Sequence, residues 1–152
     1  MPRAALQLLP GDGAVGAALT RDPRVHGVAF TGSTTTARQI RRAMADTLEP
    51  GAPLAAETGG LNAMLVDSTA LPEQAVRAVS ESAFQSAGQR CSARRCLYVQ
   101  RDFYTDFVAL LTGAMDELSL GDPLHLSTDI GPIIDAAAAR SIHDHIARAR
   151  SE

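Results

Sequence analysis

The sequence predicts an α/β fold, because short apolar segments of strand type alternate with longer segments of helix type along most of its length. The chain has 152 residues, of which 45% are hydrophobic and 20% charged, a composition typical of globular proteins. It contains no internal repeat and no low-complexity segment. This length corresponds to one domain or to parts of two.

The first third of the sequence predicts strands and helices in alternation. Apolar runs at 6–9 and 25–30 are each followed by a turn and then by a segment of helix type. Ser33 or Thr34 can cap the second of these helices. The expected elements are a strand at 6–9, a helix at 14–19, a strand at 25–30 and a helix at 35–45.

The rest of the sequence continues the pattern around a pair of glycines, Gly59 and Gly60. Pro72 suits the first turn of a helix, and apolar residues recur at helical spacing between Phe103 and Leu118. The expected elements are strands at 53–57, 63–66 and 96–99, and helices at 72–86 and 103–118. A last helix reaches the C-terminus without a stop signal, so we expect a fragment of a longer protein.

Composition and charge exclude several classes of function. The net charge is −3, and the 14 Lys and Arg residues form no cluster dense enough to follow a nucleic-acid backbone. No apolar run approaches the roughly 18 residues that a membrane span needs, and the N-terminus lacks the pattern of a secretory signal. The histidines and cysteines form no metal-ligand set. We therefore expect a cytoplasmic protein with no nucleic-acid partner, no membrane segment and no metal.

Two glycine-containing turns are candidates for binding a phosphate group. Gly11, Gly13 and Gly16 have the spacing of a dinucleotide-binding fingerprint, but the acidic residue expected about 20 positions later is missing, so we favour a turn that packs a helix on a strand. Gly32 and Ser33 lie at a strand-to-helix turn, where backbone N–H groups and a hydroxyl suit a pyrophosphate. A simple helix cap explains Ser33 equally well.

Cys91 and Glu57 are the candidates for covalent and acid–base chemistry. Three arginines lie within four residues of Cys91, and positive charge favours a nucleophilic thiolate. The alternative is an inert buried cysteine, which is the expectation for Cys96 in its apolar strand. Glu57 ends an apolar stretch, where burial would raise its pKa toward that of a general base, and a solvent-facing turn residue is the alternative.

These segments occur in the order of the signatures of the aldehyde dehydrogenase superfamily. Residues 28–33 resemble its coenzyme turn, 56–62 its glutamate signature and 84–91 its cysteine signature. The separation of Glu57 and Cys91, 91 − 57 = 34 positions, is also that of the family, and the likeness continues through 122–123 and 127–132. Within the family, 57–64 and 87–93 resemble the dehydrogenase half of bifunctional proline utilisation A proteins.

The resemblance implies NAD-dependent oxidation of L-glutamate γ-semialdehyde to L-glutamate. Cys91 would attack the aldehyde to give a thiohemiacetal and then a thioester, and Glu57 would activate the water that hydrolyses it. Gly32 and Ser33 would lie by the pyrophosphate of NAD. Arg90 and Ser92 flank the thiol, and our hypothesis is that they bind the substrate carboxylate.

The resemblance also implies the domain organisation. Residues 1–58 would be the C-terminal part of a Rossmann-type NAD-binding domain, and 59–152 the N-terminal part of the catalytic domain, together a partial aldehyde dehydrogenase fold. The full-length enzyme is expected to be a homo-oligomer, with the possibility of a fused proline dehydrogenase domain. Two other readings stay open, namely a non-catalytic remnant or assembly module, and a thiol esterase that uses Cys91 and Glu57 without NAD.

Overall fold

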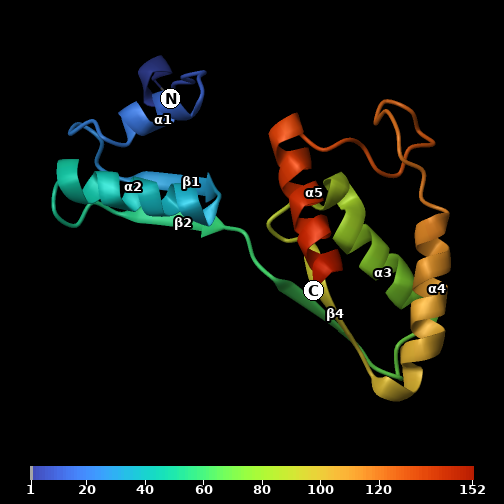
Figure 1. Cartoon of the computed structure of the whole chain (residues 1–152). Helices are drawn as coiled ribbons and strands as arrows, with labels where there is room; N and C mark the ends of the chain where they lie inside the picture. Colours follow the sequence, from blue (N-terminus) through green and yellow to red (C-terminus); the bar gives the residue numbers. More distant parts are fainter. Residues whose placement is uncertain (1) are drawn as a thin grey trace. The chain divides into compact units, whose positions relative to one another are not determined.

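The chain divides into two compact units, Met1–Gly59 and Gly60–Glu152, in a computed structural model that describes residues 2–152. Each unit contains one pair of parallel strands joined by a helical crossover, as Figure 1 shows. The division falls one residue after the boundary expected from the sequence. Within residues 2–152, no helix is both long enough and apolar enough to cross a membrane.

The first unit is built around a β–α–β crossover. Strands β1 (Val28–Gly32) and β2 (Leu54–Thr58) pair in parallel, and helix α2 (Thr34–Thr47) connects them. Ile40, Met44 and Leu48 are buried between the helix and the strands. This apolar stripe recurs every four residues, which is the spacing that places side chains on one face of a helix. The burial therefore fixes α2 over the sheet.

The segment ahead of this crossover differs from its prediction. It contains the 3-10 helix η1 (Arg3–Ala5) and helix α1 (Gly13–Leu19), but residues 6–9 form no strand. Leu6 and Leu8 are exposed by 82% and 89%. An isolated extended segment leaves its backbone groups unpaired, so an apolar run becomes a strand only where a partner strand is available. None is available to this run within the described part of the first unit.

The second unit repeats the parallel pairing. Strands β3 (Asn62–Val66) and β4 (Arg94–Val99) are connected by helix α3 (Pro72–Phe84) and the 3-10 helix η2 (Gln85–Gly88). The chain continues through η3 (Arg101–Phe103), α4 (Tyr104–Asp116) and α5 (Ala136–Ser151). The core joins α3, α4 and the two strands, and its buried members are Val66, Val76, Val79 and Phe107.

The register of β4 corrects the expectation for Cys96. Leu97 and Val99 pack against the core, so the alternation of a strand turns Cys96 and Tyr98 toward the other face of the sheet. Cys96 is half-buried there, and Tyr98 is exposed. The expected strand is present, but the expectation that Cys96 is buried is only partly met, because Cys96 is half-buried and does not pack against this core.

Candidate active site

Gly32 and Glu57 come to the same edge of the sheet in the first unit. In the parallel register, Thr31 is opposite Glu57 and Gly32 is opposite Thr58. Gly32 and Glu57 therefore lie at the carboxyl ends of their strands, which is where open α/β sheets bind their ligands. The coenzyme-turn candidate and the carboxylate candidate are thus neighbours within one unit.

The N-terminus of α2 has backbone donors available to a ligand. Ser33 is its N-cap, and the Ser33 Oγ accepts a hydrogen bond from the Thr36 N–H at 3.0 Å. Among the described residues, nothing accepts a hydrogen bond from the N–H of Thr34 or Thr35. The first turn carries no acidic side chain. Free N–H groups at the positive end of a 14-residue helix form a setting that suits an anion.

Helix α1 shows the opposite arrangement. The Asp12 carboxylate accepts hydrogen bonds from the N–H groups of Ala14 and Val15 at 2.9 and 3.4 Å. The protein's own carboxylate therefore occupies the N-terminus of α1. No strand precedes this turn and α1 has no buried residue, so the structure supports neither a dinucleotide fingerprint at Gly11, Gly13 and Gly16 nor the favoured turn that packs a helix on a strand.

Glu57 has an exposed side chain near the end of β2. Its carboxylate accepts no hydrogen bond from any residue in 2–152. The first unit by itself therefore does not supply the apolar burial that the sequence suggested for this group. What it does supply is a carboxylate open to water, on the same edge of the sheet as Ser33.

A left-handed turn leads from α3 to Cys91. Ser86, Ala87 and Gly88 have φ values of 56°, 54° and 67°, and this is why α3 ends at Phe84 and not at 86 as predicted. A Cβ on Gly88 would lie only 2.9 Å from the Ala83 carbonyl oxygen, so glycine is required there for space as well as for φ. Two non-glycine residues in this conformation store backbone strain, a feature that clusters at functional sites.

Gln89 fastens this turn in two directions. The Gln89 Nε2 donates to the Ser86 carbonyl at 2.9 Å, and the Gln89 Oε1 accepts from the Ile134 N–H at 2.8 Å. The Arg95 Nη2 also donates to the Gly88 carbonyl at 2.7 Å. One of these hydrogen bonds therefore lies within the turn, one connects it to β4 and one connects it to the loop before α5.

Asn62 holds the residues on the other side of the thiol. The Asn62 Nδ2 donates to the carbonyls of Cys91 and Ala93, at 2.6 and 3.0 Å. The Ala93 N–H donates to the Arg90 carbonyl at 3.2 Å, and Ala93 is only 2% exposed. Cys91 itself is exposed. The backbone around the thiol is thus fixed while the thiol stays accessible, so the alternative of an inert buried cysteine does not describe Cys91.

The arginines near Cys91 use neutral acceptors. The Arg90 Nη1 donates to the Gln85 side-chain oxygen at 3.0 Å, and the Arg94 Nη1 donates to the Ser92 carbonyl at 3.4 Å. Neither these two nor Arg95 forms an ion pair with a carboxylate in residues 2–152. Within residues 2–152, the positive charge of this turn is therefore not neutralised by a carboxylate.

The structure places Gly32, Ser33 and Glu57 in the first unit, and Arg90, Cys91 and Ser92 in the second. Sequence reasoning missed the two residues that hold the thiol turn, Asn62 and Gln89. Asn62 is the only asparagine in the sequence, and it begins a strand between Leu61 and Ala63. The sequence signal that could have identified Asn62 was a single polar amide between the apolar residues Leu61 and Ala63.

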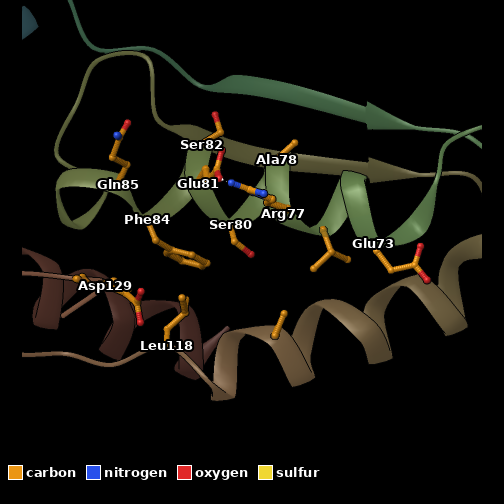
Figure 2. Close-up of a pocket in the computed structure, with 13 residues that line it drawn as sticks. Glu73, Arg77, Ala78, Ser80, Glu81, Ser82, Phe84, Gln85, Leu118 and Asp129 are labelled. Carbon is orange, nitrogen blue, oxygen red and sulfur yellow. Dashed lines mark hydrogen bonds and ion pairs between the residues drawn. The ribbon is translucent and has the colours of Figure 1, made fainter. Parts of the chain in front are cut away.

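A cavity of about 740 Å³ also opens in the second unit, between α3 on one side and the end of α4 with the chain that follows it on the other (Figure 2). Phe84 reaches into it from α3, and Leu118 and Asp129 lie on its other side. None of the six candidate residues lines it. The Ser80 hydroxyl in its wall is buried without a hydrogen-bond partner among the described residues. The cavity therefore does not include the thiol, although Gln85, which accepts the hydrogen bond from Arg90, forms part of its wall.

Comparison with known proteins places these features in one family. The sequence matches the aldehyde dehydrogenase family over residues 1–152, and the chain belongs to that family. It is 53% identical to the bifunctional protein PutA of Klebsiella aerogenes over 156 aligned positions. That alignment covers 100% of this chain and 12% of the relative, so the chain spans about an eighth of the length of the curated relative it matches.

Solved structures give the same result for the fold. The structure matches a crystal structure of a proline utilization A (PutA) mutant from Bradyrhizobium japonicum with a TM-score of 0.94 and 52% identity, over 100% of this chain and 16% of that one. It matches 1-pyrroline-5-carboxylate dehydrogenase from Thermus, solved with bound NAD, with a TM-score of 0.84 and 35% identity, over 95% and 29% of the two chains. The expected partial aldehyde dehydrogenase fold is confirmed.

Proposed function

We propose that this chain carries the thiol and the carboxylate of an NAD-dependent enzyme that oxidises L-glutamate γ-semialdehyde to L-glutamate. The observation that carries the proposal is the Cys91 turn, in which a fixed backbone presents an exposed thiol. The similarity to PutA proteins and to a pyrroline-5-carboxylate dehydrogenase supports the choice of substrate. In this proposal residues 1–58 belong to the NAD-binding domain and 59–152 to the catalytic domain.

The N-terminus of α2 is the proposed site for the pyrophosphate of NAD. The N–H groups of Thr34 and Thr35 are unoccupied by the described residues, and the exposed Ser33 hydroxyl and the Gly32 backbone lie beside them. These donors fit a doubly charged group at a helix N-terminus. When bound, NAD supplies the acceptor for the electron pair that the aldehyde carbon loses on oxidation.

Cys91 is the proposed nucleophile. Its thiolate sulfur forms a bond to the aldehyde carbon, and the carbonyl oxygen becomes an oxyanion. No described residue accepts a hydrogen bond from the Cys91 N–H, so this donor is available to the oxyanion. After oxidation, the same carbon is held as a thioester on Cys91.

Glu57 is the proposed general base for the second half of the reaction. It removes a proton from a water molecule, whose oxygen bonds to the thioester carbon. The carbon–sulfur bond then breaks, the thiolate of Cys91 is restored, and the product leaves as a carboxylate. An exposed carboxylate at the open edge of β1 and β2 is suited to receive that water.

Arg90 and Ser92 are the proposed contacts to the carboxylate of the substrate. Arg90 uses one nitrogen to bind Gln85, which leaves other guanidinium donors for an anion. Both residues are exposed on either side of Cys91. The larger protein is proposed to be a cytoplasmic homo-oligomer with a fused proline dehydrogenase domain, and the bifunctional PutA relative supports the second fused activity.

A chimera tests this function directly. The matched segment of PutA from Klebsiella aerogenes is replaced by this chain, and NADH formation from glutamate semialdehyde is followed. We expect the chimera to form NADH and Cys91→Ala to lower the rate by at least about 10³-fold, since the covalent route is lost. Cys96→Ala is the matched control and should leave the rate unchanged, because Cys96 lies within β4, opposite Ala63, and outside the Cys91 turn.

Two results would contradict the proposal. One is a folded chimera without turnover while the unaltered relative is active, which favours a non-catalytic assembly role. The other is ester hydrolysis by the chimera that needs Cys91 but is indifferent to NAD, with no NADH formed, which favours a thiol esterase.

A further inference from the structure

We infer that Asn62 is a positioning residue for Cys91, whose amide fixes the peptide that follows the thiol and thereby orients both the sulfur and the Cys91 N–H. The inference rests on the proposed function in one respect, namely that Cys91 is the nucleophile. Its structural basis is independent of NAD and of the identity of the aldehyde.

The Asn62 amide has the right number of donors for this task. Its Nδ2 carries two hydrogens, and the structure directs that nitrogen at two carbonyls, those of Cys91 at 2.6 Å and Ala93 at 3.0 Å. These carbonyls lie on either side of Ser92. A single side chain from β3 therefore fastens the tip of the turn that enters β4.

Planar peptides convert these bonds into control of Cys91. The Cys91 carbonyl shares a rigid plane with the Ser92 N–H, and Asn62 fixes this plane. The Arg90 carbonyl shares a plane with the Cys91 N–H, and the Ala93 N–H fixes that one. With the peptides before and after Cys91 both held, its φ and ψ are set, and so is the direction of its Cα–Cβ bond.

The strand ladder alone does not hold this turn. Asn62 is opposite Arg94, but Ala63 is opposite Cys96, so the register shifts by one residue where the turn meets the sheet. Regular backbone pairing begins only after the irregularity. Among the described residues, the hydrogen bonds between β3 and residues 91–93 are therefore those from the Asn62 side chain.

A second amide supplies a matched control at the opposite end of the same strands. The Gln100 Oε1 accepts from the Ser68 N–H at 2.9 Å, just beyond the carboxyl ends of β3 and β4. Gln100 also bridges the two strand ends, and its recorded hydrogen-bond partners, Val66, Ser68 and Phe103, are not candidate site residues. Asn62→Ala and Gln100→Ala each remove one bridging amide, and only the first removes a contact to Cys91.

The test compares two reactions of Cys91 in the 152-residue chain, each followed at the Cys91 peptide by mass spectrometry. Acylation by p-nitrophenyl acetate passes through an oxyanion that the Cys91 N–H can stabilise, whereas alkylation by iodoacetamide passes through none. We expect Asn62→Ala to slow acylation by about 10- to 100-fold, and alkylation by less than about 3-fold. Gln100→Ala should change neither rate.

Equal acylation rates in the unaltered chain and Asn62→Ala, including no measurable acylation in either, would overturn the inference. A parallel fall in both reactions would also overturn it, because that pattern indicates general loosening and not positioning. Acylation that depends on Asn62 in a protein without NADH formation would sustain the inference while the proposed dehydrogenase function fails.

A measurement on the unaltered chain covers the case in which Asn62→Ala does not fold. Because Asn62 is the only asparagine, selective ¹⁵N labelling of asparagine gives one side-chain NH₂ pair in the NMR spectrum. We expect both hydrogens to exchange with solvent more slowly than in a free asparagine, and the pair to shift when Cys91 is alkylated. Exchange at the free rate, or no shift, would contradict the inference.

Discussion

Cys91 and Glu57 are presented by their two units in different ways. The Cys91 turn is held by side chains from β3, β4 and the turn itself, and the residues flanking the thiol have little backbone freedom. Glu57 is exposed, and its carboxylate accepts no hydrogen bond from the described chain. The backbone around the proposed nucleophile is thus held within one unit, whereas the proposed base has no hydrogen-bond partner among the described residues.

Glu57 lies near the carboxyl end of a strand, whereas Cys91 lies just before the amino end of one. Glu57 and the Gly32–Ser33 turn follow the carboxyl ends of β1 and β2, beside unoccupied helix N–H groups. Cys91 precedes the amino end of β4, where the backbone is irregular and strained. The difference matches the two proposed roles, ligand binding at the open edge of β1 and β2 and covalent chemistry at the strained turn.

The largest effect within this comparison is expected from Glu57→Gln. Loss of the base should slow thioester hydrolysis by about 10²- to 10⁴-fold while leaving attack by Cys91 intact. In the chimera, NADH formation should show a rapid first turnover followed by a slow steady state. Stopped-flow measurement checks this. A slow first turnover would show that Glu57 acts before oxidation, contrary to its assigned role.

Ser33 separates helix capping from coenzyme binding. Ser33→Ala removes the cap bond to Thr36 and should lower stability by about 0.5–2 kcal/mol. Ser33→Asp keeps an acceptor for that N–H, so the helix should stay stable, but its negative charge lies beside the proposed pyrophosphate site. We therefore expect the KM for NAD in the chimera to rise more in Ser33→Asp than in Ser33→Ala.

The measurements for Ser33 are thermal unfolding followed by circular dichroism and KM for NAD. An unchanged KM in Ser33→Asp would remove the N-terminus of α2 from the proposed coenzyme site. It would leave the role of Ser33 as a cap intact.

The smallest effects are expected from the strained turn, and they concern stability. Gly88→Ala places a Cβ at a φ of 67° and 2.9 Å from the Ala83 carbonyl oxygen, so we expect a loss of about 2 kcal/mol. Ala87→Gly relieves a φ of 54° and should raise stability by up to about 1 kcal/mol. Two substitutions at adjacent positions are thus predicted to have opposite signs.

Tyrosine fluorescence during urea unfolding measures these changes in the second unit alone. The chain has no tryptophan, and its two tyrosines, Tyr98 and Tyr104, both lie in that unit. If Ala87→Gly lowered stability as much as Gly88→Ala does, the left-handed conformation of Ala87 would be wrong.

The sequence predicted the elements whose signals are local. A cap of α2 at Ser33 or Thr34, Pro72 at the start of α3 and the apolar stripe of α4 each depend on neighbours within a turn or two. It also identified Cys91 as the candidate for a reactive thiol, because its sequence neighbours are polar and basic. The family signatures predicted the fold of the whole chain, and the family match covers residues 1–152.

The features it did not predict depend on pairing between distant segments. The run at 6–9 has no partner strand, and the faces of β4 follow from its register against β3 and α3. The role of Asn62 requires the turn before β4 to return to β3, across 29 positions of sequence. Local propensity carries no information on such contacts, so the thiol could be predicted but not what holds it.

The most direct test of this account is the mass of the Cys91 peptide from a Glu57→Gln chimera mixed with glutamate semialdehyde and NAD. The account predicts an acyl group on Cys91, trapped as a thioester because hydrolysis is slow, and none on Cys96. An adduct on Cys96, or an NADH-forming chimera with no adduct on Cys91 even when quenched during the first turnover, would contradict it.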